Sequence, residues 1–242
     1  MSKSLSLFLL ALVFLASCKT PNIVVSESLK TNTNVYDASG RQGFQFNQVV
    51  RFGDYYTSKI KRGWTKSRDI TFVMRFQKAQ QKLSFMQFAP DSSSAEVLAV
   101  SKFKNNEIEL LRDFLSYSTQ YENTFAGTII TSGDSSQSWE FMIHNPESSL
   151  PRYADCGVAN SADGKVISIR GVKKIENQSN WIQLDNHGFE FTMDGKAVAA
   201  VSTINKGRVW LHNELSSSDK LVIASLSTAL LVRHSIQEQF EE

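Results

Sequence analysis

Three residues have side chains that could do chemistry at a catalytic site: Cys156, Asp185 and His187. An extended segment would place Asp185 and His187 on one face, where both could bind a metal ion. Cys156 could act as a nucleophile if a neighbouring base or cation lowered the pKa of its thiol. No third metal ligand is evident, and residues 153–158 contain no histidine or basic residue. We therefore expect a polar turn and a buried structural thiol, with an enzyme using these residues as an alternative.

Longer catalytic and cofactor-binding motifs are absent from the sequence. The chain contains no G-x-S-x-G, H-E-x-x-H, P-loop or G-x-G-x-x-G pattern. The sequence therefore predicts a protein that is not an enzyme and that needs no cofactor and no metal.

One segment combines basic and aromatic side chains. It contains Arg51, Lys59, Lys61, Arg62, Trp64, Lys66 and Arg68, interleaved with Tyr55 and Tyr56 and opposed only by Asp54 and Asp69. Such a segment can bind anionic lipid head groups at a membrane interface or a partner protein. The alternative is a solvated hairpin face with incidental charge.

The N-terminus has the layout of a secretory signal. Lys3 precedes an apolar run over residues 5–15, which is shorter than the ~20 residues of a membrane-spanning helix. The run leads into Leu15-Ala16-Ser17-Cys18, which resembles a bacterial lipobox. This resemblance implies cleavage after residue 17 and a diacylglycerol on Cys18, which would hold the protein on a membrane. An ordinary signal peptide with an incidental cysteine is the alternative.

The residues after Cys18 indicate where the protein would reside. Residue 19 is Lys rather than Asp, which, by resemblance to enterobacterial sorting rules, does not imply retention at the inner membrane. We expect an outer-membrane lipoprotein that faces the periplasm, where it would not meet nucleic acid. Residues 18–34 are rich in Ser, Thr and Asn and are predicted to form a lipidated tether.

The composition fits one globular domain over residues 35–242. Of the 242 residues, 41% are hydrophobic and the formal net charge is +2, which argues against a dedicated nucleic-acid binder. Two cysteines cannot form a disulfide scaffold.

Alternating apolar residues predict many antiparallel strands. Trp139, Phe141 and Ile143 alternate with Glu140, Met142 and His144, and Phe189, Phe191 and Met193 alternate with Glu190, Thr192 and Asp194. Further strands are expected over residues 70–77, 83–89, 97–103, 107–114, 125–131, 165–170, 181–184, 197–204 and 208–212. Asp163-Gly164 and Asp194-Gly195 predict hairpin turns. Strands recurring at this spacing favour a sandwich or a barrel.

A C-terminal helix over about residues 218–235 decides between these architectures. Residues 221–232 carry no charge and have apolar side chains on every face, which predicts burial all round. Only the chain's own sheet could bury such a helix. We therefore expect a mainly β fold: an antiparallel barrel of about 10–12 strands wrapped around the hydrophobic C-terminal α-helix.

This arrangement is similar to the tubby-like barrel of the tubby, phospholipid scramblase and LURP-one-related proteins. The resemblance rests on Phe125-Ala126-Gly127-Thr128-Ile129, Trp139-Glu140-Phe141, Gly188-Phe189-Glu190-Phe191, Asp194-Gly195-Lys196, Gly207-Arg208-Val209-Trp210-Leu211 and Ala229-Leu230-Leu231. It implies a fold rather than an activity. The phosphoinositide-binding residues of tubby and the calcium site of scramblases have no recognisable counterparts here.

The sequence thus predicts a membrane-anchored envelope lipoprotein that acts as a binding or scaffold module. Its partner would be anionic lipid or another envelope protein. A lipoprotein that carries a lipid inside a half-barrel is the first alternative, and the enzyme described above is the second.

Overall fold

The computed structural model describes residues 21–42, 47–63, 81–101, 124–132, 137–144, 156–178 and 186–237. Within these ranges the protein is mainly β, with one short 3₁₀ helix, η1 (Glu27–Leu29), and one long α-helix, α3 (Ser217–Gln237). The strands are β1 (Thr33–Asp37), β2 (Arg51–Phe52), β3 (Tyr55–Thr57), β4 (Lys61–Arg62), β5 (Gln81–Phe88), β6 (Ser94–Ser101), β7 (Thr124–Ser132), β8 (Ser138–His144), β9 (Cys156–Ser161), β10 (Val166–Val172), β11 (Gly188–Met193), β12 (Lys196–Ser202) and β13 (Arg208–His212).

All of these strands belong to one antiparallel sheet. Their order is β1-β13-β12-β11-β10-β9-β8-β7-β6-β5-β3-β2, and β4 pairs separately with β5. The two edge strands approach each other at a bridge between Ser39 and Arg51. There the Ser39 amide donates to the Arg51 carbonyl at 2.8 Å, and the Arg51 amide donates to the Ser39 carbonyl at 3.1 Å. The sheet therefore curls into a nearly closed barrel, as the strand spacing together with the uncharged C-terminal helix predicted.

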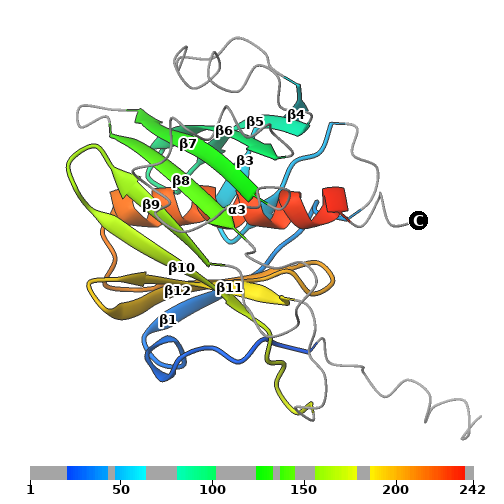
Figure 1. The fold of residues 1–242 in the computed structure, drawn as a ribbon, viewed down its shortest axis with the longest axis vertical. Helices are drawn as coiled ribbons and strands as arrows, with labels where there is room; N and C mark the ends of the chain where they lie inside the picture. Colours follow the sequence, from blue (N-terminus) through cyan, green and yellow to red (C-terminus); the bar gives the residue numbers. More distant parts are fainter. Residues whose placement is uncertain are drawn as a thin grey trace, which may run out of the picture.

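Helix α3 lies inside the curved sheet (Figure 1). Every side chain from residue 221 to residue 232 is at most 2% exposed, and α3 contacts β5, β6, β7 and β12. Leu226 and Leu230 belong to the same apolar core as Phe189, Phe191 and Val209 of the strands. The expected C-terminal helix is confirmed, because its apolar residues on all faces are buried only when a sheet surrounds it.

Local signals mark the start of α3 and one of the hairpins. The Asp219 amide donates to the Ser216 hydroxyl at 3.1 Å, which caps the helix at the place expected for its N-terminus. Asp194 and Gly195 both have positive φ angles, 49° and 77°, as a tight two-residue hairpin turn requires. The expected strands over residues 70–77, 107–114 and 181–184 lie outside the described residues, whereas β9 was not expected.

The N-terminal segment departs from the tether expected for residues 18–34. Residues 22–29 lie on the outer face of the sheet, and residues 33–34 belong to β1. Ile23, Val25 and Leu29 are buried there against Val172, Ala200 and Trp210 in a second apolar cluster. We call residues 22–29 the strap. Single apolar residues within a polar stretch gave no periodic signal, but the outer face of the barrel offers them a surface on which to pack.

Candidate binding site at one end of the barrel

The antiparallel topology defines two ends of the barrel. The turns β5–β6, β9–β10 and β11–β12 lie at the end where α3 begins, which we call the N-end rim (residues 90–93, 162–165, 194–195 and 213–217). The turn β12–β13 and strand β4 lie at the end where α3 finishes, which we call the C-end rim (residues 21–22, 39–42, 61–62 and 203–207). Figure 1 shows α3 crossing the molecule from one end to the other.

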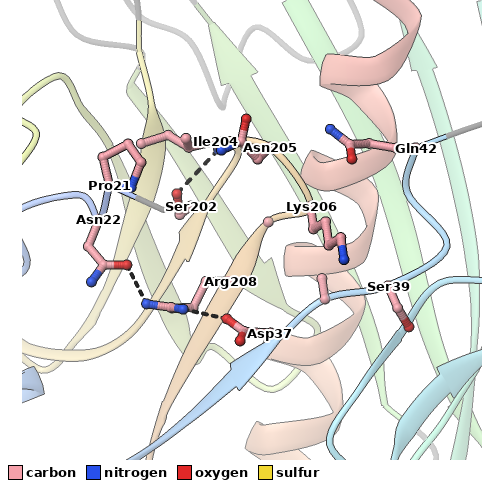
Figure 2. Close-up of a pocket in the computed structure, with 12 residues that line it drawn as sticks. Pro21, Asn22, Asp37, Ser39, Gln42, Ser202, Ile204, Asn205, Lys206 and Arg208 are labelled. Carbon is pink, nitrogen blue, oxygen red and sulfur yellow. Dashed lines mark hydrogen bonds and ion pairs between the residues drawn. The ribbon is translucent and has the colours of Figure 1, made fainter. Parts of the chain in front are cut away.

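A pocket of about 610 Å³ opens at the C-end rim. Its wall combines the start of the strap, the end of β1 and the β12–β13 turn. The lining residues are Pro21, Asn22, Asp37, Ala38, Ser39, Gln42, Ser202, Ile204, Asn205, Lys206, Gly207 and Arg208. Figure 2 shows the side chains of Asp37, Lys206, Arg208 and Gln42 around this space. The volume falls within the range of sites for small molecules.

Two cations lie in the pocket, and their surroundings differ. Arg208 donates from Nε to Asp37 Oδ1 at 2.6 Å and from Nη1 to Asn22 Oδ1, so its charge is matched and its side chain is held in place. Lys206 makes no ion pair or hydrogen bond to any other described residue. The lining therefore carries one uncompensated positive charge, together with amide and hydroxyl groups. Such a set suits a phosphate or carboxylate group.

Buried Arg41 supports the floor of this pocket. It is 3% exposed and donates from Nε to the Leu231 carbonyl of α3 at 3.0 Å. Its Nη1 donates to the carbonyls of Thr203 at 2.6 Å and Asn205 at 2.5 Å, which ties the β12–β13 turn to the helix. Sequence analysis did not single out Arg41, because an arginine in a polar loop carries no pattern that reveals a distant partner.

The predicted basic stretch is only partly described. Arg51, Lys59 and Lys61 are exposed, and the Arg51 guanidinium lies 5.4 Å from the centre of the Tyr56 ring. Trp64, Lys66 and Arg68 lie outside the described residues. None of the described members of the stretch lines the pocket at the C-end rim.

Arg62 connects the basic stretch to the pocket. Its Nη2 donates to Gln48 Oε1 at 3.2 Å. Gln48 Nε2 in turn donates to the Arg41 carbonyl at 2.9 Å. Arg62 is therefore part of the hydrogen-bond network behind the pocket, while Lys59 and Lys61 remain on the surface.

The other predicted site residues include Cys18, Asp185 and His187. Cys18 and Asp185 lie outside the described residues, and His187 directly precedes β11. The His187 amide donates to the Val172 carbonyl at 2.8 Å. In the described ranges, no group of three or more His, Cys, Asp or Glu side chains could hold a metal ion.

Cys156 begins β9, and the register gives it two neighbours that the sequence did not reveal. His144 of β8 and Arg170 of β10 are its direct cross-strand partners. His144 is buried, and its Nδ1 lies 3.0 Å from Thr124 Oγ1. A histidine and an arginine therefore flank the cysteine position across the sheet rather than along the chain.

Among the described residues, no helix is both long enough and apolar enough to cross a membrane. Comparisons with protein-family models, with curated proteins and with solved structures found no match.

Proposed function

We propose that this protein is a lipid-anchored envelope lipoprotein that acts as a non-enzymatic binding module for anionic groups. Its ligand would be the phosphate of an anionic lipid head group, and the binding site would be the pocket at the C-end rim. The observation that carries the proposal is the uncompensated charge of Lys206 in a polar pocket of about 610 Å³.

The filled barrel supports binding at the rim rather than inside. Side chains of α3 occupy the interior, where a half-barrel carrier would need room for an acyl chain. This packing favours the binding module over the lipid-carrying alternative. The lipobox-like Leu15-Ala16-Ser17-Cys18 supports the anchor, and the resemblance to tubby-like barrels supports a helix-filled fold. An outer-membrane position facing the periplasm remains part of the proposal.

Vesicle co-sedimentation tests the binding site. A Cys18→Ser protein, which would lack the acyl anchor, should bind phosphatidylglycerol vesicles at low salt and phosphatidylcholine vesicles much less. Lys206→Gln should weaken binding by about fivefold, because one basic residue near an anionic surface contributes ~1 kcal/mol. Lys196→Gln is the matched control, since Lys196 is an exposed lysine on the same hairpin but lies toward the N-end rim.

Three results would count against this site. Equal binding by the Lys206→Gln and unsubstituted proteins would remove the pocket from the proposal. Loss of binding after replacing Lys59 and Lys61 alone would move the site to the exposed part of the basic stretch. If the protein bound no vesicles at all, an anionic lipid would be excluded as the ligand, and another envelope protein would become the proposed partner.

The register around Cys156 favours a second candidate function, thiol chemistry. His144 lies opposite Cys156 in the strand register, and a neighbouring histidine can lower the pKa of a cysteine thiol and make it reactive. The test is the rate of alkylation by iodoacetamide as a function of pH, in the unsubstituted protein and in His144→Gln. A reactive thiol should alkylate rapidly below pH 8 and slow down in the variant. Alkylation that follows an ordinary thiol and ignores His144→Gln would exclude this candidate.

A further inference from the structure

The strap is joined to the barrel by backbone contacts close to its start. Ile23 and Ile175 form an antiparallel bridge. The Val24 amide donates to the Lys174 carbonyl at 2.9 Å, and the Glu176 amide donates to the Asn22 carbonyl at 2.8 Å. The strap therefore begins as a short added strand, and its first residues lie at the C-end rim.

A buried carboxylate holds the middle of the strap. Glu190 of β11 is 3% exposed and accepts hydrogen bonds from the amide and the hydroxyl of Ser26, both at 2.8 Å. Its Oε1 also accepts from Arg170 Nη2 at 3.1 Å. A buried carboxylate needs such partners, so the strap and Glu190 stabilise each other. With the apolar cluster beneath it, the strap is a fixed part of the barrel.

The fixed strap limits where an anchor on Cys18 could lie. Only Lys19 and Thr20 separate Cys18 from Pro21. Three consecutive Cα–Cα steps of a fully extended chain reach about 11 Å. Pro21 lines the pocket at the C-end rim. A lipid on Cys18 would therefore enter the bilayer beside this rim, whereas the N-end rim lies about 30 Å away along the 21 residues of α3.

The charges of the two ends agree with this placement. The N-end rim and its flanking residues carry Asp91, Asp163, Asp194, Glu214 and Asp219 against Lys165, Lys196 and Lys220. Lys165 pairs with Asp219 at 3.1 Å, so these two charges offset each other and the acidic residues remain in excess. The C-end rim carries Lys61, Arg62 and Lys206. An anionic membrane would attract the C-end rim and repel the N-end rim.

We propose that the protein docks on an anionic bilayer with its C-end rim against the head groups and its N-end rim pointing away. The strap is a rigid connection between the lipid anchor and the barrel, and it fixes the orientation of the barrel relative to the membrane. The inference rests on the proposed anchor at Cys18. It goes beyond the binding proposal because it identifies the whole C-end rim as the membrane-facing surface and the strap as the segment that orients the barrel.

The experiment uses the acylated full-length protein, reconstituted into phosphatidylglycerol-containing vesicles with a nitroxide quencher at head-group depth. A fluorophore is attached to one introduced cysteine in a Cys156→Ser background, either at Lys206→Cys or at Asp194→Cys. Strong quenching at position 206 and little at position 194 is the expected result. Equal quenching at both positions, or stronger quenching at 194, would overturn the orientation.

Mass spectrometry of the same samples separates this inference from the proposed anchor. Acylated protein without selective quenching at 206 would leave the anchor standing and overturn the orientation. Protein without an acyl group would overturn both.

A strap variant tests the orienting element. Glu190→Gln weakens the hydrogen bonds that Ser26 donates to residue 190, so selective quenching at 206 should fall while acylation persists. Glu27→Gln is the matched control, because Glu27 lies in the strap with 87% of its side chain exposed, and quenching should not change. Unchanged selectivity in Glu190→Gln, with increased protease cleavage in the strap, would show that the strap does not orient the barrel.

Discussion

Polar side chains buried between α3 and the sheet show how individual residues are stabilised in this core. Thr228 is fully buried and donates from Oγ1 to Gln87 Oε1 at 2.7 Å. Gln87, also fully buried, donates from Nε2 to the Tyr56 carbonyl at 3.1 Å. The adjacent Ser227 Oγ is buried without a hydrogen-bond partner in the described part of the chain. Neighbouring hydroxyls on one helix therefore contribute differently to stability.

Thr228→Val should lower the free energy of unfolding by about 1–3 kcal/mol, because it keeps the shape but leaves Gln87 Oε1 buried and unpaired. Ser227→Ala should leave that free energy unchanged or raise it, because it removes a hydroxyl that has no partner. Chemical denaturation of both variants measures the difference. Equal destabilisation by the two changes would show that the Thr228–Gln87 bond contributes little.

Tyr55 makes the stability of the protein sensitive to alkaline pH. Burial, reinforced by Tyr36, Asp91 and Asp54, raises the pKa of Tyr55 from 10.0 to about 12. Below pH 10 the phenol is protonated in both the folded and the unfolded states. Between pH 10 and 12 the unfolded chain ionises first, so the free energy of unfolding should fall by up to about 2 kcal/mol.

Tyr55→Phe should flatten this alkaline loss, as measured by denaturant unfolding at pH 9, 10 and 11. Tyr56→Phe is the control, because the Tyr56 side chain is 40% exposed. The assignment would be wrong if Tyr56→Phe flattened the pH dependence as much as Tyr55→Phe did.

At the scale of elements, α3 is both the centre of the core and the support of the C-end rim. Its apolar side chains pack against the strands, and its Leu231 carbonyl accepts from Arg41. The rim pocket is therefore built on the helix through the Arg41 contacts. A destabilising substitution in α3 should therefore destabilise the whole barrel rather than one separate part of it.

Leu226→Asp should abolish folding. The carboxylate would stand in an apolar interior, where it must stay protonated or displace the helix, and either outcome costs several kcal/mol. A domain is typically stable by only ~5–15 kcal/mol. Leu226→Met, which nearly conserves volume, should cost less than about 1.5 kcal/mol. Circular dichroism and thermal melts compare the variants, and an undiminished melting temperature for Leu226→Asp would contradict the enclosed helix.

At the scale of the whole molecule, the first strand of the described chain pairs with the last. β1 pairs with β13, and the strap lies across the outer side of β12 and β13. The N-terminal residues thus complete both the sheet and the outer apolar cluster. Such pairings bring together segments far apart in sequence, which favours slow folding.

A chain that begins at Thr33 would lack the strap and expose Val172, Ala200 and Trp210. We expect a lower melting temperature and a red-shifted tryptophan emission, because Trp210 is only 6% exposed beneath the strap. A chain that begins at Pro21 is the control. An unchanged melting temperature for the shorter chain would mean that the strap rests on the barrel without stabilising it.

Several features of this protein were determined locally and could be read from its sequence. The alternation around Trp139 and Phe189 predicted strands because successive side chains of a strand point to opposite faces. Asp194-Gly195 predicted a tight turn because its residues tolerate positive φ angles. The uncharged residues 221–232 predicted a helix buried on all sides, and hence the mainly β barrel around it. Each signal lies within one short window of sequence.

The remaining features depend on contacts between distant segments, and only the tertiary structure decided them. From the sequence the strap was expected to be part of a polar tether. In the folded protein, Ile23 and Leu29 pack against the outer face of β12 and β13. Arg41 has no local signal, because its acceptors are carbonyls of α3 and of the β12–β13 turn. Register across the sheet, and not spacing along the chain, places His144 opposite Cys156. Among the described residues, the fold brings no ion-pair partner to Lys206. Local periodicity predicts which face of a strand is buried, whereas pairing between strands and closure of the sheet determine which residues meet.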